Sequence, residues 1–181
     1  MAKHRMADRV VEIGSLDDIP FSVKQLAAEH FERNILNNIF ENTKVSNLKK
    51  YGNEEGFSQF FLYTHEQFGE TNAFVLYHTE VDNTGNVIGW IDFVMVRQCN
   101  RSEGIGRKIT EHAIDALKEK GCLAIFLGVL QPMSKDGEVG FPAYGSIPQL
   151  ITWGFVESGS ENKRVFSIEG ELYNQMVFVL I

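Results

Sequence analysis

The fold is indicated most clearly by two adjoining segments: residues 87–96, VIGWIDFVMV, and residues 97–109, RQCNRSEGIGRKI. The first ten residues are mostly apolar and predict a buried strand. A short polar turn follows, and two glycines then open a helical pattern. Because the first turn of a helix has unpaired backbone N–H groups and the positive end of the helix dipole, this junction favours an anion. The sequence therefore predicts an anion cradle here, suited to a phosphate-bearing cofactor.

Length, composition and charge limit the class of protein. The chain has 181 residues, 44% of them hydrophobic and 23% charged, as expected for one soluble globular domain with a substantial core. The formal net charge of −7 argues against nonspecific nucleic-acid binding, which relies on lysine and arginine. An acidic protein suits a cationic partner such as an amine.

The two cysteines and the apolar runs bear on compartment and metals. Cys99 and Cys122 have no metal-ligand spacing, so we expect no metal site and a reducing compartment. No apolar run approaches the roughly 20 residues of a membrane span. Residues 1–6 are basic, but no apolar segment of a signal peptide follows them. We therefore expect a cytoplasmic protein that does not bind membranes.

The chain before residue 87 predicts a strand, helices and a meander. Residues 9–13 suit a first strand, residues 14–20 a turn, and residues 21–39 an amphipathic helix with apolar residues at three- and four-residue spacing. A second short helix is expected at residues 46–51. Strands are expected at residues 58–65 and 73–80, with a turn at 66–72 between them, and a hairpin turn at 82–86 leads into the strand 87–96.

The chain after the glycine loop predicts a helix followed by further strands. One helical face gathers Ile105, Ile109, His112, Ala113, Ala116 and Leu117, and Gly121 is a suitable residue just past the helix end. The apolar run 122–129 predicts a buried strand, joined in parallel to 87–96 through a right-handed crossover. A Gly/Pro-rich loop at 131–145, a short helix at 147–153, and strands beginning at 154, at 164–168 and at 175–181 complete the chain. The predicted fold is one α+β domain over residues 1–181, with a mixed, mostly antiparallel sheet flanked by helices.

The glycine motif Arg101-x-x-Gly104-x-Gly106 has several interpretations on its own. An ordinary tight turn with two permissive residues is one of them. The motif is not a Walker loop, because no Gly-Lys-Ser/Thr ends it, and it lacks the third glycine of the dinucleotide fingerprint.

The surrounding order of elements favours one family. An antiparallel meander, then Arg-x-x-Gly-x-Gly, a helix, a buried strand, a short helix and Trp153-Gly154-Phe155 resembles the GCN5-related N-acetyltransferase (GNAT) superfamily. The resemblance implies an acetyl-CoA-dependent acyltransferase. It also implies that the strand end binds the pantetheine arm and the acetyl carbonyl, and that the loop wraps the pyrophosphate through its backbone amides. The cofactor-binding residues implied in this way are Val94, Met95, Val96, Arg101, Ser102, Glu103, Gly104, Ile105, Gly106 and Arg107.

The catalytic residues are less well marked. Where the family commonly has a tyrosine that protonates the leaving thiolate, four residues before Gly154, this chain has Leu150, so Tyr144 is the nearby candidate. The family's asparagine after the buried strand is also missing from residues 129–132. Asp92 interrupts an apolar strand and is either a base toward the amine or paired structurally. His65, His78 and Glu80 are expected at the surface, and His112 as a core or boundary histidine.

The sequence thus favours direct acetyl transfer from acetyl-CoA to a primary amine, of a small molecule or a protein, by a monomer or homodimer. The alternative is an acyl-CoA-binding or protein-interaction module that kept the fold and lost the acid, as Leu150 allows. Transfer of another acyl group is a third possibility.

Overall fold

A computed structural model describes residues 7–29, 36–37, 39–41, 43, 58–132, 147–159, 164–168 and 171–181. The chain divides into two compact units, residues 1–123 and 124–181, which are described separately below. The α+β class is confirmed in both. Among the described residues, no helix is both long and apolar enough to cross a membrane.

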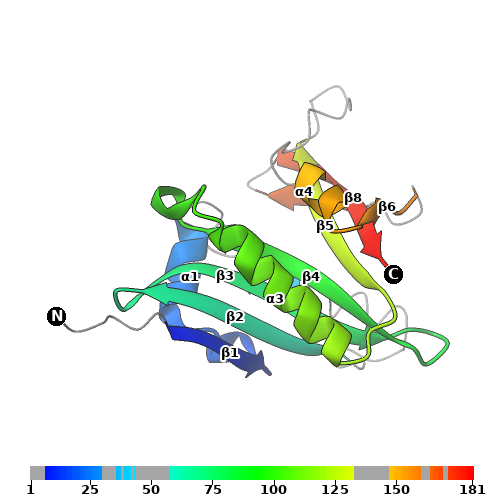
Figure 1. Ribbon diagram of the computed structural model, residues 1–181, viewed down its shortest axis with the longest axis horizontal. Coiled ribbons are helices and arrows are strands. Elements are labelled where there is room, and N and C mark those ends of the chain that lie inside the picture. Colours follow the sequence, from blue (N-terminus) through cyan, green and yellow to red (C-terminus); the bar gives the residue numbers. More distant parts are fainter. Residues whose placement is uncertain are drawn as a thin grey trace. The chain divides into compact units, whose positions relative to one another are not determined.

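The first unit is built on an antiparallel meander (Figure 1). Its strands are β1 (Ala7–Ile13), β2 (Gln59–Gln67), β3 (Glu70–Val81) and β4 (Val87–Val96), and each pairs with the next in antiparallel register. The predicted bounds of β4 are confirmed, and so is the predicted meander. Both follow from local signals, because each strand is apolar and each connection carries turn residues.

The two hairpin turns differ in how well the sequence predicted them. The predicted turn at 66–72 is too long, because only Phe68 and Gly69 separate β2 from β3, with φ of 55° and 80°. Positive φ at both central residues is the geometry of a two-residue type I′ hairpin. In the second turn, Asp82 Oδ1 accepts hydrogen bonds from the backbone N–H groups of Thr84 (2.8 Å) and Asn86 (2.9 Å), and the prediction is confirmed.

Helices cover both faces of this sheet. The 3₁₀ helix η1 (Leu16–Asp18) precedes α1 (Phe21–Ala28), which contacts β3, while α3 (Ile105–Glu119) contacts β2, β3 and β4 from the other side (Figure 1). Prediction placed the end of the first helix near residue 39, but α1 ends at Ala28, and residues 36, 37, 39–41 and 43 are again helical. The predicted helix at 46–51 lies outside the described residues.

The packed face of α3 differs in part from the prediction. Ile109, Ala113 and Leu117 have no exposed area, as the periodicity indicates. Thr110 and Ile114 are also buried, whereas the predicted His112 and Ala116 are half-buried at the edge of the face. On the sheet side, Gly89 gives room to the helix, since a Cβ there would lie 2.8 Å from Leu117 Cδ2.

The carboxylate of Asp8 holds the edge strand β1 to its neighbouring elements. Asp8 Oδ1 lies 2.8 Å from His65 Nδ1, and Asp8 Oδ2 accepts a hydrogen bond from Lys108 Nζ at 2.8 Å. Partial burial raises the pKa of Asp8, but hydrogen bonds from Lys108, His65 and Tyr63 outweigh burial and lower it to about 2. The carboxylate therefore links β1 to β2 and α3 in its ionised form.

The second unit is a smaller antiparallel arrangement around β8 (Glu171–Leu180). β5 (Ile125–Pro132), β6 (Val156–Glu157) and β7 (Arg164–Ile168) each pair with β8, and α4 spans Ile147–Thr152. β5 begins three residues later than predicted, because Gly121 turns the chain with φ of 78° and Leu123 N–H donates to Val87 O at 2.9 Å. The parallel pairing expected between 87–96 and 122–129 would join the two units and stays a prediction, as does the single-domain organisation.

Candidate functional site

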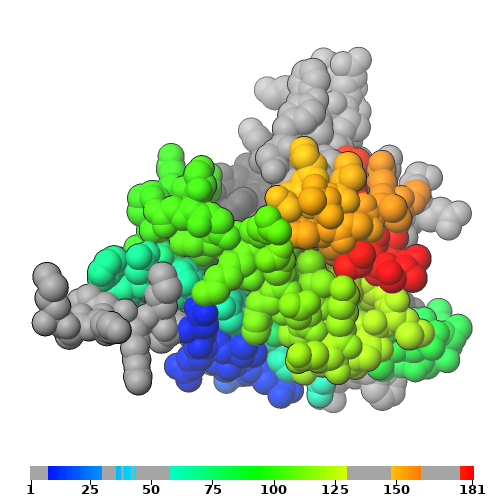
Figure 2. All heavy atoms as spheres, in the orientation of Figure 1, coloured from blue at the N-terminus to red at the C-terminus, as the bar shows by residue number. Residues whose placement is uncertain are grey.

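The glycine loop joins β4 to α3 by two residues in left-handed conformation. The 3₁₀ helix η2 (Gln98–Asn100) follows β4, and Ser102 and Gly104 then have φ of 68° and 78°. Gly104 is the N-cap of α3, and no side-chain hydrogen bond caps the helix at this residue. Positive φ is strained for residues with a Cβ, so Gly104 fits this position well. Figure 2 shows the green atoms of this region standing at the surface at one end of the first unit.

The backbone of this loop presents unpaired donors. Within the described part of the chain, the N–H groups of residues 102–107 have no acceptor, and the first backbone bond of α3 runs from Lys108 N–H to Gly104 O at 3.0 Å. A Cβ on Gly104 would meet nothing within 4 Å. A set of unpaired N–H groups beside open space at a helix N-terminus fits a phosphate group.

The three basic side chains near the loop have different hydrogen-bond partners. Arg101 Nε donates to Val96 O at 3.2 Å, which folds its side chain back over the strand end. Arg107 Nε donates to Glu111 Oε1 at 2.7 Å along the exposed face of α3, and Lys108 is bound to Asp8. The backbone N–H of Arg107 is therefore better placed to bind an anion than its side chain, which is paired with Glu111. The side chain of Glu103 is exposed to solvent.

The three residues at the end of β4 differ in burial. Met95 is buried, whereas Val94 is 38% exposed and Val96 is half-buried. Gly106 follows the loop on the side of Val96, since a Cβ there would lie 3.3 Å from Val96 Cγ2. Residues 94–96 thus lead directly into the loop with the unpaired N–H groups.

The sequence model of the acetyltransferase (GNAT) family matches residues 24–135, more than half of the chain. The chain belongs to the GNAT family. The matched segment includes the whole of β4, the glycine loop and α3, which are the elements described above. A comparison with curated protein sequences finds no significant match.

Solved structures support the same fold. The protein is similar to the ribosomal-protein-S18-alanine N-acetyltransferase of Escherichia coli, with a TM-score of 0.59 and 15% identity over 96% of this chain and 93% of the other. It is also similar to Arabidopsis thaliana Naa50 in complex with the bisubstrate analogue CoA-Ac-MVNAL, with a TM-score of 0.59 and 16% identity over 95% and 98%. An acyl-CoA N-acyltransferase of Pseudomonas aeruginosa has a TM-score of 0.55 and 16% identity over 96% and 99%. At these identities the likeness shows a shared fold.

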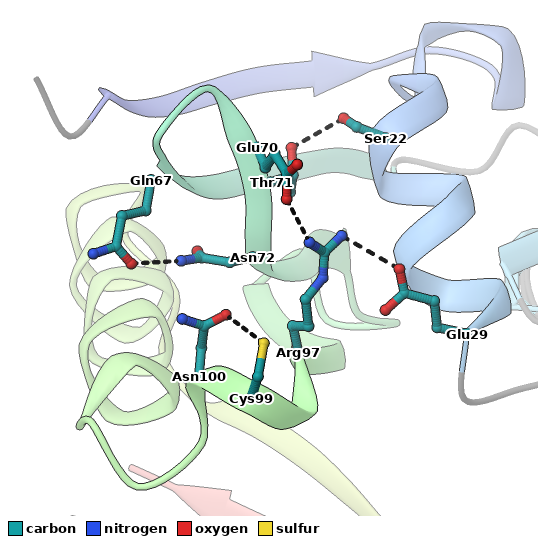
Figure 3. Close-up of polar contacts among 9 residues, drawn as sticks. All are labelled: Ser22, Glu29, Gln67, Glu70, Thr71, Asn72, Arg97, Cys99 and Asn100. Atoms are coloured by element: carbon teal, nitrogen blue, oxygen red, sulfur yellow. Dashed lines mark hydrogen bonds and ion pairs between the residues drawn. The ribbon is translucent and has the colours of Figure 1, made fainter. Parts of the chain in front are cut away.

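In this GNAT protein, Arg97 anchors the start of the loop (Figure 3). Its Nη1 donates to Glu70 Oε2 at 2.8 Å and its Nη2 to Glu29 Oε1 at 3.3 Å, while its backbone N–H donates to Asn72 O at 2.8 Å. The side chain therefore ties the end of β4 to the β2–β3 hairpin and to the C-terminus of α1. Sequence reasoning missed this residue, because its partners are 27 and 68 positions away.

Asp92 is paired on the opposite face of the sheet from α3. It occupies a bulge in β4, because Leu76 pairs with Phe93 and Tyr77 with Ile91. Its Oδ2 lies 2.6 Å from His78 Nδ1, and the side chains of Asp92 and His78 are only 10% and 5% exposed. Of the two roles left open by the sequence, the structure shows pairing and leaves the role of base as a proposal.

Two further polar residues complete this buried cluster. Glu80 Oε2 lies 3.9 Å from His78 Nε2, and Trp90 Nε1 donates to Glu80 Oε1 at 3.1 Å. Burial lowers the pKa of His78, but Asp92 and Glu80 outweigh burial and raise it to about 9. His78 is therefore a buried imidazolium at neutral pH.

The predicted surface positions of three polar residues are wrong. His65, His78 and Glu80 are all at most 4% exposed, because each has a polar partner from a neighbouring strand or from its own strand. The histidine expected at the core boundary, His112, is half-buried as predicted and stacks on Tyr63 at 4.0 Å between ring centroids.

The other catalytic candidate, Tyr144, lies outside the described residues. Leu150 is 2% exposed in α4, so the residue in the family's tyrosine position is an apolar core residue here. In the described part of the chain, no group of three or more histidine, cysteine or acidic residues is arranged to hold a metal ion.

Proposed function

We propose that this protein is an acetyl-CoA-dependent N-acetyltransferase that transfers the acetyl group directly to a primary amine. The observation that carries the proposal is the row of unpaired backbone N–H groups at residues 102–107, beside the open space at Gly104. Acetyl-CoA supplies a pyrophosphate for such donors and a thioester for the chemistry. These N–H groups fit the pyrophosphate of the cofactor, because they lie at a helix N-terminus, where hydrogen-bond donors and the helix dipole both favour an anion.

The residues of the loop and strand have separate tasks in binding. The N–H groups of Ser102, Glu103, Gly104, Ile105, Gly106 and Arg107 bind the pyrophosphate. Arg101 has terminal guanidinium nitrogens left for a phosphate oxygen, because among the described residues it is bound only through Nε, to Val96 O. The backbone of Val94, Met95 and Val96 holds the pantetheine arm and the acetyl carbonyl.

Catalysis requires a proton acceptor, an oxyanion donor and a proton for the leaving thiolate. A backbone N–H at the end of β4 stabilises the oxyanion that forms when the amine attacks the acetyl carbon. Asp92 accepts the proton of the attacking amine, and Tyr144 protonates the thiolate. No covalent intermediate on the protein is needed.

The acceptor is an amine of a small molecule or of a protein. A peptide N-terminus belongs among the candidates, because one similar structure acts on an alanine of a ribosomal protein and another binds an analogue joining CoA to the peptide MVNAL. The net charge of −7 favours a cationic acceptor over nucleic acid. We propose a cytoplasmic monomer or homodimer that does not bind membranes, and its two free cysteines suit that compartment.

A binding module without catalysis is the second candidate. The observation in its favour is Leu150, because a buried leucine donates no proton to a thiolate. The two candidates share the cofactor loop and differ only in turnover. Transfer of a longer acyl group is a further variant of the first candidate.

Release of free thiol from acetyl-CoA separates these functions. The protein is mixed with acetyl-CoA and a panel of alkylamines, arylamines and short peptides with free N-termini, and thiol is followed with a chromogenic reagent. Amine-dependent release supports the transferase, and faster release from propionyl-CoA or a longer thioester supports the variant. Saturable binding of acetyl-CoA without release across the panel supports the module, and absence of any acyl-CoA binding contradicts both.

A further inference from the structure

The cluster around His78 links three strands on the face of the sheet that α3 does not cover. His78 pairs with Trp90 across β3 and β4, and the next pair is Thr79 with Gly89, whose Cβ position meets α3. Because side chains alternate along a strand, His78 lies on the opposite face from α3. The centroid of its ring lies 4.8 Å from the ring centroid of Phe60 on β2, and the ring centroids of Phe60 and Phe40 are 4.5 Å apart.

The two oxygens of Asp92 have different surroundings. Oδ2 is held by His78 at 2.6 Å, whereas the described residues provide no partner for Oδ1. The side chain is nine-tenths buried and keeps some exposed area. A carboxylate held at one oxygen, with no described partner at the other, is arranged to accept a proton or a hydrogen bond at the second oxygen.

The bulge places this carboxylate near the proposed acetyl site. Bulges redirect side chains and are common beside active sites. Asp92 precedes Val94 by two residues, about 7 Å along a strand. Asp92 therefore lies on the same strand as, and two residues before, the segment that would hold the acetyl carbonyl.

His78 is itself held in place. Among the described residues, the charged groups facing it are Glu80 from its own strand and Asp92 from β4, and the facing group on β2 is the ring of Phe60. The indole N–H of Trp90 binds Glu80 in turn. The order of contacts is therefore Trp90, Glu80, His78, Asp92, and it ends at Oδ1.

We infer that His78 is a positioning residue: with Glu80 and Trp90 behind it, the imidazole ring holds the carboxylate of Asp92 so that Oδ1 faces the acceptor amine. This inference rests on the proposed N-acetyltransferase function. The amine gives one proton to Asp92, directly or through one water, and its nitrogen forms the bond to the acetyl carbon. The bond from that carbon to the thioester sulfur breaks, and the leaving thiolate takes up a proton from Tyr144, as proposed above. His78 keeps its own proton throughout.

Kinetics of His78 variants test the inference. His78→Asn keeps an amide donor near the position of Nδ1 without the charge, and His78→Phe keeps a ring without the donor. We expect kcat to fall by roughly tenfold or more in His78→Phe and to be partly restored in His78→Asn, with an unchanged Kd for acetyl-CoA. In His78→Asn the acidic limb of the kcat/KM profile should differ from that of the wild-type protein, because the variant replaces the group that holds Asp92 Oδ2 at 2.6 Å.

The pair of His65 and Asp8 provides a matched control. It is another buried histidine bound through Nδ1 to an aspartate, at 2.8 Å, and Lys108 of α3 binds the same carboxylate. His65→Asn should lower stability without moving the pH profile. Equal effects of His65→Asn and His78→Asn on the acidic limb, or an unchanged kcat in His78→Phe, would overturn the inference.

An NMR titration measures the coupling independently of turnover. The imidazole signals of His78 should titrate near pH 9 in the wild-type protein and at least one pH unit lower in Asp92→Asn. An identical titration in both proteins overturns the inference even if the enzyme is active. A coupled pair in a protein that binds acetyl-CoA but acetylates no amine contradicts the proposed function, and the positioning role fails with it.

Discussion

Substitution of Gly104 by glutamate gives the sharpest test of the cofactor loop, because the chain offers a matched control at the other end of the same helix. Gly104 and Gly121 both have φ of 78°, and a Cβ on either would meet nothing within 4 Å. Gly104→Glu and Gly121→Glu therefore introduce the same side chain at the same φ, and a Cβ meets no atom within 4 Å at either position. Only Gly104 borders the unpaired N–H groups.

The magnitudes follow from strain and charge. Left-handed backbone costs a residue with a Cβ about 1–2 kcal/mol, so each variant should lose a few degrees of Tm. At Gly104 the new carboxylate would lie about 6 Å from a phosphate charge, which costs about 3 kcal/mol at an effective dielectric constant of 20 and about 2 kcal/mol after screening by salt. We expect acetyl-CoA affinity to fall roughly thirtyfold in Gly104→Glu and to be unchanged in Gly121→Glu.

Isothermal titration calorimetry with acetyl-CoA measures the effect, and Gly104→Gln separates charge from bulk. The glutamine variant should lose clearly less affinity than the glutamate variant, and the difference should shrink at high salt. Equal Kd values for Gly104→Glu and Gly121→Glu, with both proteins folded by thermal melting, would refute the location of the phosphate site.

Three further predictions concern stability. Gly89→Ala should destabilise the protein by about 1–3 kcal/mol in urea unfolding, because its Cβ would overlap Leu117, and Leu117→Ala in the same chain should recover part of that loss. The pKa of Asp8 is lowered to about 2, so its stabilisation is present above about pH 4 and is lost as the pH falls toward 2; acid melts of Asp8→Asn should lack this loss. The pKa of His78 is raised to about 9, so its stabilisation is complete below about pH 6.5 and is lost as the pH rises through 9, and melting curves of Asp92→Asn should show a weaker alkaline decline.

The elements around the loop were predictable because their signals are local. An apolar run followed by glycines determines β4, the loop and the start of α3, and glycine at position 104 adopts the positive φ of the loop without strain. The matched family segment, residues 24–135, contains the same elements. Local apolar patterns also located β7 and most of the meander.

The polar partnerships were not predictable, because they depend on register across strands. The sequence shows Asp92 as an isolated carboxylate and His78 as a surface residue, but a bulge brings them to 2.6 Å on one face of the sheet. Arg97 likewise binds Glu70 and Glu29 only because the hairpin and the end of α1 meet beside β4. A bulge changes the register by one residue, and no local pattern of residue types marks its position here.

The most direct measurement of the central claim is a titration of the ¹⁵N-labelled protein with acetyl-CoA, followed by backbone amide NMR. We expect saturable shifts of the amide signals of residues 102–107, larger than those of residues at the C-terminal end of α3. CoA should reproduce these shifts, because it carries the same pyrophosphate. Saturable binding that leaves the signals of residues 102–107 unchanged, or no binding at all, would contradict a pyrophosphate site at this loop.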